Sequence, residues 1–507
     1  MKKATYFPIF MLLVVNLLVA QSIDDSFSQN KMQKDLEIFK KIRLATNSGL
    51  YKYRTPREID SIYKWADHKI KESSTYRDFY NIINQLTDFE GSLHNNTNLP
   101  KKINQSLINE ESGYFPYPIK FIEGKWIMNY DKGKIPLGAE IISINTTKIE
   151  EIIKNTYKYY TTDGINTTGK RIGLLYSFSK YYRLHYGLTD TFTVVYKEYN
   201  SDEPKTTLLK SVGNKKYYTH VENRYSKEFD NGIYKDWDKH EKYDFRLINP
   251  DSGLLTINTF NIGWHANHVE HKQYVQFLDS IFSIVKRDKI TNLIIDVRKN
   301  GGGTDPNDLV TYSYLTDRNF SENKEAWISF RKIPFLQYNS DSNVPYLIKL
   351  MGVGKFNKEF QKEFPKEMNG KFYQDATSSD HMIRTPKPNA FHGNIYLLTD
   401  PNIASAASLF AAMVASNKNT TIIGEETMGG YFGHNGHVPL HYTLPKSKIE
   451  TGFSVVNLEQ DVSKKKNQLH KRGIIPDYTV TQSYKDFLNH NDTQMNFAID
   501  LINQNTQ

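Results

Sequence analysis

Ser405 stands where the apolar run NIYLLTD (residues 394–400) gives way to an alanine-rich stretch. The run is typical of a buried strand that ends in a turn, and the apolar residues after Ser405 recur at the spacing of a helix face. Ser405 is therefore expected at the first turn of a helix, where backbone N–H groups lack intrahelical partners. An anion beside Ser405 would meet the free N–H of Ala406. A hydroxyl next to such an anion site is half of an acyl-transfer centre.

A glycine-rich loop offers the second half. The segment LIIDVRKNGGG (residues 293–303) is an apolar strand that runs into three consecutive glycines. Gly301 and Gly302 would let the backbone come close to a substrate carbonyl and present N–H groups to the developing oxyanion. Taken alone, the same loop could also be a flexible strand-to-helix connection or a weak phosphate cradle.

A serine nucleophile also needs a group that takes its proton, and an imidazole near its ordinary pKa is the commonest choice. The segment YFGHNGHVPLHY (residues 431–442), interpreted as a loop, holds His434, His437 and His441. We expect His434 to be the base, because glycines on both sides would let the loop fold back over the site. His437 is the second candidate. The alternatives are hydrogen-bonding histidines without catalytic work, or a metal site whose spacing fits but which has no evident carboxylate partner.

The elements that must position these residues alternate between strand and helix from about residue 252 onward. Apolar strand-like runs near residues 252–260, 292–297, 394–400 and 420–424 are separated by segments with helical periodicity. This alternation predicts an α/β fold with repeated βαβ units around a mostly parallel sheet. Both candidate loops then follow strands of one sheet. Residues 317–390 interrupt the pattern as a long insertion.

The amino-terminal half has a different character. Residues 21–112 carry three segments with helical periodicity and are expected to form a helical cap. Residues 113–211 contain short β-like runs and are expected to form a small β-rich domain, whose exposed edge could take up an extended peptide. Residues 212–251 are interpreted as linker or loop, and residues 252–507 as the catalytic core.

Composition limits the class of protein. With 507 residues, two or three domains are expected. Residues 1–20 have two lysines followed by an apolar run that ends at Ala20, which predicts a cleaved secretory signal. We therefore expect a secreted or periplasmic protein without stable membrane insertion. The chain has no cysteine, which excludes disulfides and thiol catalysis. Its net charge of +9 is spread along the sequence, so no nucleic-acid partner is indicated.

Four motifs in order resemble the tail-specific peptidase family, the S41 serine peptidases that include C-terminal processing proteases and tricorn-core relatives. They are LIIDVRKNGGG, ASAAS, IIGEETMGG and RGIIPDYTV, and IPLGAEIISIN (residues 135–145) resembles the PDZ-like module of many members. The resemblance implies a core of ClpP/crotonase-like type, a protein or peptide substrate and no cofactor. It also implies that Ser405 is the nucleophile and that Ala406 with the Gly301–Gly302 peptide forms the oxyanion hole.

The chain departs from this family at the base. Gly430 occupies the position at which the processing proteases carry a lysine, and Thr256 stands where the tricorn branch is expected to place a histidine. Glu425 could orient a base, although capping the following turn is the role we expect for it. His94, in FEGSLHNNTNLP, resembles the family's GDGHT segment, and we expect it to pack between domains rather than to act in catalysis.

Two classes of function remain after this comparison. The first is a secreted serine endopeptidase that works through an acyl-enzyme on Ser405. The second is a catalytically inactive protein that binds a peptide or ligand on the same scaffold, which the loss of both familiar bases favours. Reactivity of Ser405 towards an organophosphonate distinguishes the two.

Overall fold

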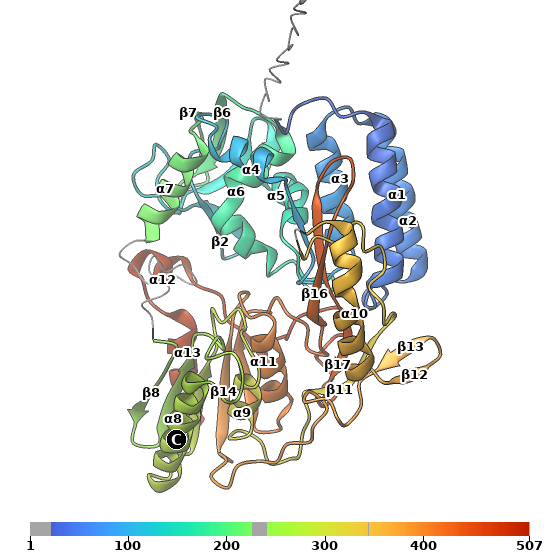
Figure 1. The fold of residues 1–507 in the computed structure, drawn as a ribbon. Helices are drawn as coiled ribbons and strands as arrows, with labels where there is room; N and C mark the ends of the chain where they lie inside the picture. Colours follow the sequence, from blue (N-terminus) through green and yellow to red (C-terminus); the bar gives the residue numbers. More distant parts are fainter. Residues whose placement is uncertain (1–21, 226–240, 343, 506–507) are drawn as a thin grey trace, which may run out of the picture.

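The structure is a computed structural model that describes residues 22–225, 241–342 and 344–505 (Figure 1). The predicted signal segment, residues 1–20, lies outside the described residues. Within the described part of the chain, no helix is both long and apolar enough to span a bilayer. The chain has a mixed α/β fold with three separate sheets, each of six strands.

The first sheet carries the two candidate loops. Its strand order is β18-β15-β14-β10-β9-β8, and every neighbouring pair is parallel except β8 with β9. The predicted alternation of strands and helices is thus confirmed in this region, although antiparallel pairs predominate over the three sheets together. The strands are β8 (Tyr243–Asn249), β9 (Ser252–Ile257), β10 (Asn292–Asp296), β14 (Asn394–Thr399), β15 (Thr420–Gly424) and β18 (Tyr478–Thr479).

Helix α11 (Ala406–Ser416) begins one residue after Ser405, as the sequence predicts. All eleven of its residues are buried. Five of the eleven are alanine, and such small side chains let the helix backbone lie close to the surrounding core. The same region of the chain also contains α8 (Val269–Arg287), α9 (Asn307–Tyr312), α13 (Thr493–Asn505) and α12 (Tyr484–Asn489), whose Tyr484 and Phe487 pack against β2 and β3 of the third sheet.

The second sheet is antiparallel and joins distant parts of the chain. Its order is β1-β17-β11-β13-β12, with β16 also paired to β17. The predicted insertion supplies three of its strands and helix α10. The segment with three histidines, which we interpreted as a loop, is mostly strand: its alternating apolar residues face the hydrophobic cluster around β17. The elements are β1 (Asn96–Asn98), β11 (Asn323–Ile328), α10 (Tyr346–Glu363), β12 (Lys366–Met368), β13 (Lys371–Tyr373), β16 (Asn435–Thr443) and β17 (Glu450–Gln460).

Three amino-terminal helices lie beside the β16–β17 hairpin (Figure 1). The predicted helical segments are confirmed as α1 (Gln29–Thr46), α2 (Pro56–Glu72) and α3 (Tyr76–Phe89), followed by the shorter α4 (Lys101–Ile108). Reciprocal capping boxes define the starts of α2 and α3, because a threonine side chain and the acidic residue three positions later satisfy each other's backbone N–H groups.

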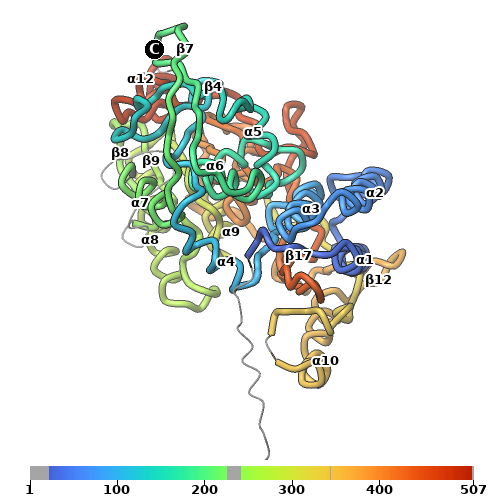
Figure 2. The backbone as a smooth tube through the Cα atoms, turned by 90° about the horizontal axis from the view of Figure 1, so that it is seen from above, coloured from blue at the N-terminus to red at the C-terminus, as the bar shows by residue number. Residues whose placement is uncertain are grey.

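The third sheet is antiparallel, with the order β2-β3-β4-β6-β7 and β5 paired to β4. It lies on the opposite flank of the molecule from α1 and α2 (Figure 2). Helix α6, which the sequence analysis did not predict, packs against it. The elements are β2 (Ile119–Ile122), β3 (Lys125–Met128), β4 (Glu140–Ile144), β5 (Thr147–Lys148), α5 (Ile149–Thr156), the 3₁₀ turn η1 (Tyr157–Tyr159), α6 (Lys170–Tyr186), β6 (Thr191–Lys197) and β7 (Pro204–Lys210).

Residues 212–251 are not simply a linker. They include helix α7 (Asn214–Tyr225) and strand β8, and residues 226–240 between them lie outside the described part. Tyr217 of α7 is fully buried and packs against α6, while β8 extends the first sheet by pairing with β9. Tertiary contacts therefore order a stretch whose own sequence has little periodicity.

A buried ion pair joins α1 to the end of α3. Arg43 Nε lies 3.2 Å from Glu90 Oε1, and the two side chains are 0% and 3% exposed. The guanidinium also stacks on the ring of Phe453 in β17 at 4.2 Å. Burial lowers the pKa of Arg43 and raises that of Glu90, so each charge depends on the other for compensation.

We predict that Glu90→Gln destabilises the protein by roughly 3–5 kcal/mol, because it leaves the Arg43 cation buried without a counter-charge. Thermal and urea unfolding measure the effect. Glu72→Gln is the matched control, because the Glu72 side chain is exposed in its pair with Lys69 and its removal should change the stability little. Equal losses of unfolding free energy in the two variants would contradict a stabilising role for the buried Arg43–Glu90 pair.

Candidate active site

Two loops meet at one edge of the parallel sheet because they follow neighbouring parallel strands. The loop after β10 contains the three glycines, and the loop after β14 ends at Ser405. The backbone N–H of Lys299 donates to Asp400 Oδ1 at 3.1 Å and ties the two loops together. A Cβ placed on Gly302 would lie only 2.8 Å from Ser405 Cβ, so glycine is required for this approach.

Ser405 has a strained backbone. Its φ of 53° and ψ of −134° lie in a region that residues with a side chain rarely adopt. The turn leaves the Ser405 side chain partly exposed, while Ala404 and Ala406 on either side are buried. Ser408 Oγ, one turn along the helix, donates to Ser405 O at 2.7 Å and helps to hold the bend. Such a bend projects a nucleophile from the start of a helix.

The imidazole that contacts Ser405 belongs to His94. His94 Nε2 lies 3.3 Å from Ser405 Oγ, and His94 Nδ1 lies 2.8 Å from the backbone oxygen of Asn435. A carbonyl oxygen only accepts hydrogen bonds, so Nδ1 must carry the proton. The unprotonated Nε2 is then the nitrogen that faces the serine hydroxyl, which is the arrangement that general-base catalysis needs.

The backbone on either side of His94 is anchored to several elements. Asp163 accepts from Leu93 N–H at 3.0 Å and from Gly430 N–H at 2.9 Å, so it connects the His94 segment to the loop after β15. Asn95 Nδ2 donates to Glu90 Oε2 at 2.7 Å. Burial raises the pKa of Asp163 to about 7. These contacts fix where the His94 ring can lie.

Burial determines the charge state of His94. Loss of solvation lowers its pKa from 6.5 to about 4, and the nearby His437 cation acts in the same direction. The folded protein therefore favours the neutral ring. Since the unfolded chain binds this proton below pH 6.5 and the folded chain only below about 4, His94 destabilises the fold as the pH falls through that interval.

His434, the base predicted from sequence, has no hydrogen bond to Ser405 in the structure. Its ring packs against that of His94 with a centroid distance of 4.9 Å, and only 2% of the residue is exposed. Its Nδ1 is buried without a hydrogen-bond partner among the described residues. Burial holds the pKa of His434 well below its usual value. The imidazole in contact with Ser405 Oγ is that of His94 instead.

The other two histidines of β16 face different partners. His437 Nε2 lies 3.3 Å from Glu322 Oε1, and this carboxylate overcomes burial to raise the pKa of His437 to about 10. A protonated imidazole cannot accept the serine proton. His441 Nδ1 lies 2.7 Å from Asp341 Oδ1. The three histidines therefore form no common metal site, and no other metal-binding group of three or more His, Asp or Glu residues occurs in the described ranges.

The predicted oxyanion donors differ in their distance from Ser405 and in the hydrogen bonds that they already make. Ala406 N–H is at the first turn of α11, and a Cβ on Gly302 would lie 3.1 Å from its nitrogen. The N–H of Gly302 donates to Asn300 Oδ1 at 2.9 Å, so it is already engaged, while Gly301 is exposed. Glu425 lies 3.3 Å from Arg171, and neither histidine near Ser405 is its partner in the described chain. Of the predicted donors, the Ala406 N–H is the one that lies next to Ser405.

The sequence of the catalytic half of the chain is similar to a known peptidase family. The sequence model of peptidase family S41 matches residues 251–480. Residues 251–480 are thus similar to peptidase family S41, a family whose name implies protein or peptide substrates, and the matched region includes Ser405. No curated protein sequence matches the chain.

Two solved structures show that the similarity in fold extends beyond the S41 region. The crystal structure of mature CPAF has a TM-score of 0.59 at 13% identity and covers 91% of this chain and 94% of its own. Mature CPAF complexed with lactacystin has a TM-score of 0.57 at 13% identity and covers 93% and 98%. At this identity the comparison shows the fold alone.

His94, expected from the sequence to pack between domains, lies in contact with Ser405 instead. The resemblance of FEGSLHNNTNLP to the GDGHT segment was a usable signal, but the residue lies 311 positions before Ser405. Tertiary contacts bring the two together: His94 is hydrogen-bonded to Asn435 at the start of β16, and β1, just after His94, pairs with β17. His434 was preferred because its place in the chain is close to the missing lysine at Gly430.

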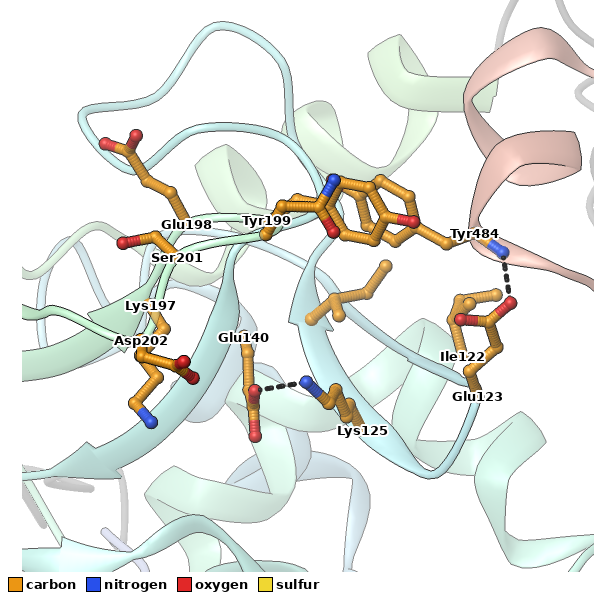
Figure 3. Close-up of a pocket in the computed structure, with 13 residues that line it drawn as sticks. Ile122, Glu123, Lys125, Glu140, Lys197, Glu198, Tyr199, Ser201, Asp202 and Tyr484 are labelled. Atoms are coloured by element: carbon orange, nitrogen blue, oxygen red, sulfur yellow. Dashed lines mark hydrogen bonds and ion pairs between the residues drawn. The ribbon is translucent and has the colours of Figure 1, made fainter.

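A separate cavity of about 340 Å³ lies away from these residues, between the third sheet and α12 (Figure 3). Tyr199 stacks on Tyr484 at 3.4 Å, and Lys125 pairs with Glu140 at 2.9 Å (Figure 3). The charges that line it include both signs, and none of its residues belongs to the Ser405 site. It therefore offers no group to the chemistry at Ser405.

We predict that His94 titrates near pH 4 and His437 near pH 10, whereas an unperturbed histidine titrates near 6.5. Selective ¹³C labelling of histidine, with NMR spectra recorded across the pH range, measures both values. His94→Gln and His437→Gln assign the two signals. A His94 signal that titrates near 6.5 would show that its ring is solvated rather than packed against Ser405.

Proposed function

We propose that the chain is a serine endopeptidase in which Ser405 is the nucleophile and His94 is the general base. The observation that carries this proposal is the pair of contacts at His94: Nε2 lies 3.3 Å from Ser405 Oγ, and Nδ1–H is held by Asn435 O. The family match supports peptide-bond hydrolysis as the reaction. In this proposal His94 replaces both the lysine that is missing at Gly430 and the sequence-predicted His434.

The reaction would proceed in two halves. Ser405 Oγ attacks the scissile carbonyl carbon while its proton moves to His94 Nε2, and the resulting oxyanion lies against Ala406 N–H. His94 Nε2–H then protonates the leaving amine as the carbon–nitrogen bond breaks, which leaves an acyl group on Ser405. Water then attacks the acyl carbon while its proton passes to Nε2, and the carbon–Oγ bond breaks as Nε2–H returns the proton to Ser405 Oγ, which releases the acid product.

In a serine–histidine–aspartate triad a carboxylate orients the imidazole. In this scheme the backbone carbonyl of Asn435 has that role. The Asn435 oxygen fixes the tautomer and the plane of the His94 ring, but its dipole stabilises the imidazolium less than a full negative charge would. This agrees with the low pKa of His94. The base is then neutral at ordinary pH and ready to accept a proton, although with reduced basicity.

Gly302 would complete the oxyanion pocket if its N–H exchanged the hydrogen bond to Asn300 for one to the substrate oxygen. Its N–H now donates to Asn300 Oδ1, and a substrate oxyanion beside Ala406 would compete for this donor because a charged acceptor binds an N–H more strongly than a neutral amide does. We include the Gly301–Gly302 peptide in the oxyanion hole on this basis.

The remaining domain assignments belong to the same proposal. We assign residues 21–112 to a cap, residues 113–211 to a PDZ-like module and residues 252–507 to a core of ClpP/crotonase-like type. The β4–turn–β5–α5 order supports the PDZ-like assignment, and the parallel first sheet supports the core. The amino-terminal residues 1–20 support secretion or a periplasmic location.

We predict that a fluorophosphonate probe labels Ser405 in the native chain and does not label Ser405→Ala. His94→Gln should slow both labelling and peptide hydrolysis by roughly 10²- to 10⁴-fold, because the base is lost. His434→Gln is the matched control and should keep most of the rate. Intact-mass measurement and a quenched-peptide assay give the two readouts.

Each result discriminates between the alternatives. A larger loss in His434→Gln than in His94→Gln would return the base to His434. No labelling of folded native protein would favour the inactive binding protein on the same scaffold, since an unactivated serine does not react.

We predict that Gly302→Ala abolishes Ser405 labelling. Its φ of +109° disfavours a side chain, and the new methyl would lie 2.8 Å from Ser405 Cβ. Gly354→Ala in α10 is the matched control, because a Cβ there also meets no atom within 4 Å and the residue lies outside the site. Labelling and thermal unfolding of both variants separate an effect on the site from an effect on folding. Normal labelling of Gly302→Ala would contradict the close approach of the two loops.

A further inference from the structure

A second cavity opens beside the His94 segment, and we call it the lysine cavity. It measures about 620 Å³ and lies between α3, β1, η1 and α6. The residues that define it here are Tyr80, Asn95, Lys158, Tyr159, Lys180 and Tyr181. None of them belongs to the cavity between the third sheet and α12.

The lysine cavity adjoins the site of the proposed reaction. Leu93 and Asn95, the residues on either side of His94, both line it. Met428 lines it from the loop after β15, and the next residue, Gly429, donates its N–H to Ile403 O at 3.1 Å, two positions before Ser405. The lysine cavity is therefore lined by the immediate chain neighbours of His94 and by a loop that is hydrogen-bonded to the segment before Ser405.

The charged groups of the lysine cavity are all cations. Lys158 and Lys180 line it, and no Asp or Glu does among the described residues. Asp88, which is paired with Lys170, acts on Lys158 from outside the lining. Lys180 is half-buried, and its ammonium has no hydrogen-bond or ion-pair partner within the described chain. Lys158 Nζ lies 2.8 Å from His185 Nδ1, a neutral partner whose pKa burial lowers to about 3. Neither positive charge is matched by an anion in the wall.

Aromatic rings make the lysine cavity less polar than bulk water. Tyr159 stacks on Tyr80 with centroids 6.5 Å apart and on Tyr181 at 5.2 Å. Lys158 is buried and Lys180 is half-buried, and this loss of solvation lowers the pKa of Lys158 to about 8 and also lowers that of Lys180. An unpaired cation in such surroundings gains more from a bound anion than an exposed lysine does.

We propose that the lysine cavity is a substrate subsite that binds a carboxylate of the peptide, with Lys180 as its direct partner. The carboxylate belongs either to a Glu or Asp side chain or to a free C-terminus, and the test below distinguishes them. The inference rests on the proposed peptidase function, which it deepens by naming the substrate class. An acidic group recognised here sets which peptides are aligned with Ser405.

The test uses matched libraries of fluorescent peptides. In one pair of libraries each position in turn is fixed as Glu or Gln, and in the other the C-terminus is free or amidated. Hydrolysis is measured with the native chain and binding by anisotropy with full-length Ser405→Ala. We expect the carboxylate form to be preferred, and Lys180→Met to reduce that preference by about ten- to a hundredfold, as for loss of a charged hydrogen bond.

Two variants act as controls. Lys180→Arg keeps the charge and should retain the preference. Lys154→Met removes an exposed lysine of α5 that does not line the lysine cavity, and it should change nothing. Thermal unfolding of each variant confirms that the fold is kept.

The outcomes separate the subsite from the peptidase proposal. A Lys180-dependent preference for Glu assigns a side-chain carboxylate, and one for the free C-terminus assigns the terminal carboxylate. No preference, or one that persists in Lys180→Met, overturns the subsite even when hydrolysis is normal. Absence of hydrolysis together with Lys180-dependent binding to Ser405→Ala would refute the peptidase and leave the subsite standing.

Discussion

The hydrogen bond from His94 Nδ1 to the backbone oxygen of Asn435 is the contact on which the site depends. It places the proton of the imidazole on the nitrogen that faces away from Ser405, so that the other nitrogen can accept the serine proton. Because the acceptor is a main-chain atom, its position is set by the pairing of β16 with β17 rather than by a rotatable side chain. The chemistry thus depends on the register of an antiparallel hairpin.

That hairpin connects the parts of the molecule that contribute to the site. The parallel sheet brings Ser405 and Gly302 to one edge, β17 pairs with β1 just after His94, and the Arg43–Glu90 pair fastens α1 to the end of α3. Asp163 then connects the His94 segment with the loop after β15. The lysine cavity lies along the same segment, so the groups proposed for chemistry and for substrate selection share one anchored stretch of backbone.

Local patterns predicted the elements whose signals are local. The strand before Ser405, the helix after it and the three amino-terminal helices follow from periodicity, and the strand-end position of the glycine loop follows from the βαβ alternation. Three features were out of reach. β8 and α7 are ordered by tertiary contacts, β16 was hidden among glycines and a proline, and His94 meets Ser405 across 311 residues. Two opposite effects then separate the other histidines from Ser405: burial encloses His434 and lowers its pKa, whereas the carboxylate of Glu322 outweighs burial at His437 and keeps that ring charged.

The most direct test of the account is a crystal structure of the chain with a phosphonate bound covalently to Ser405 Oγ. The account predicts that the phosphonyl oxygen lies within hydrogen-bond distance of Ala406 N, that His94 Nε2 faces Ser405 Oγ, and that Nδ1 remains on Asn435 O. An adduct whose oxygen points away from α11, or one in which His434 rather than His94 contacts the serine, would contradict it.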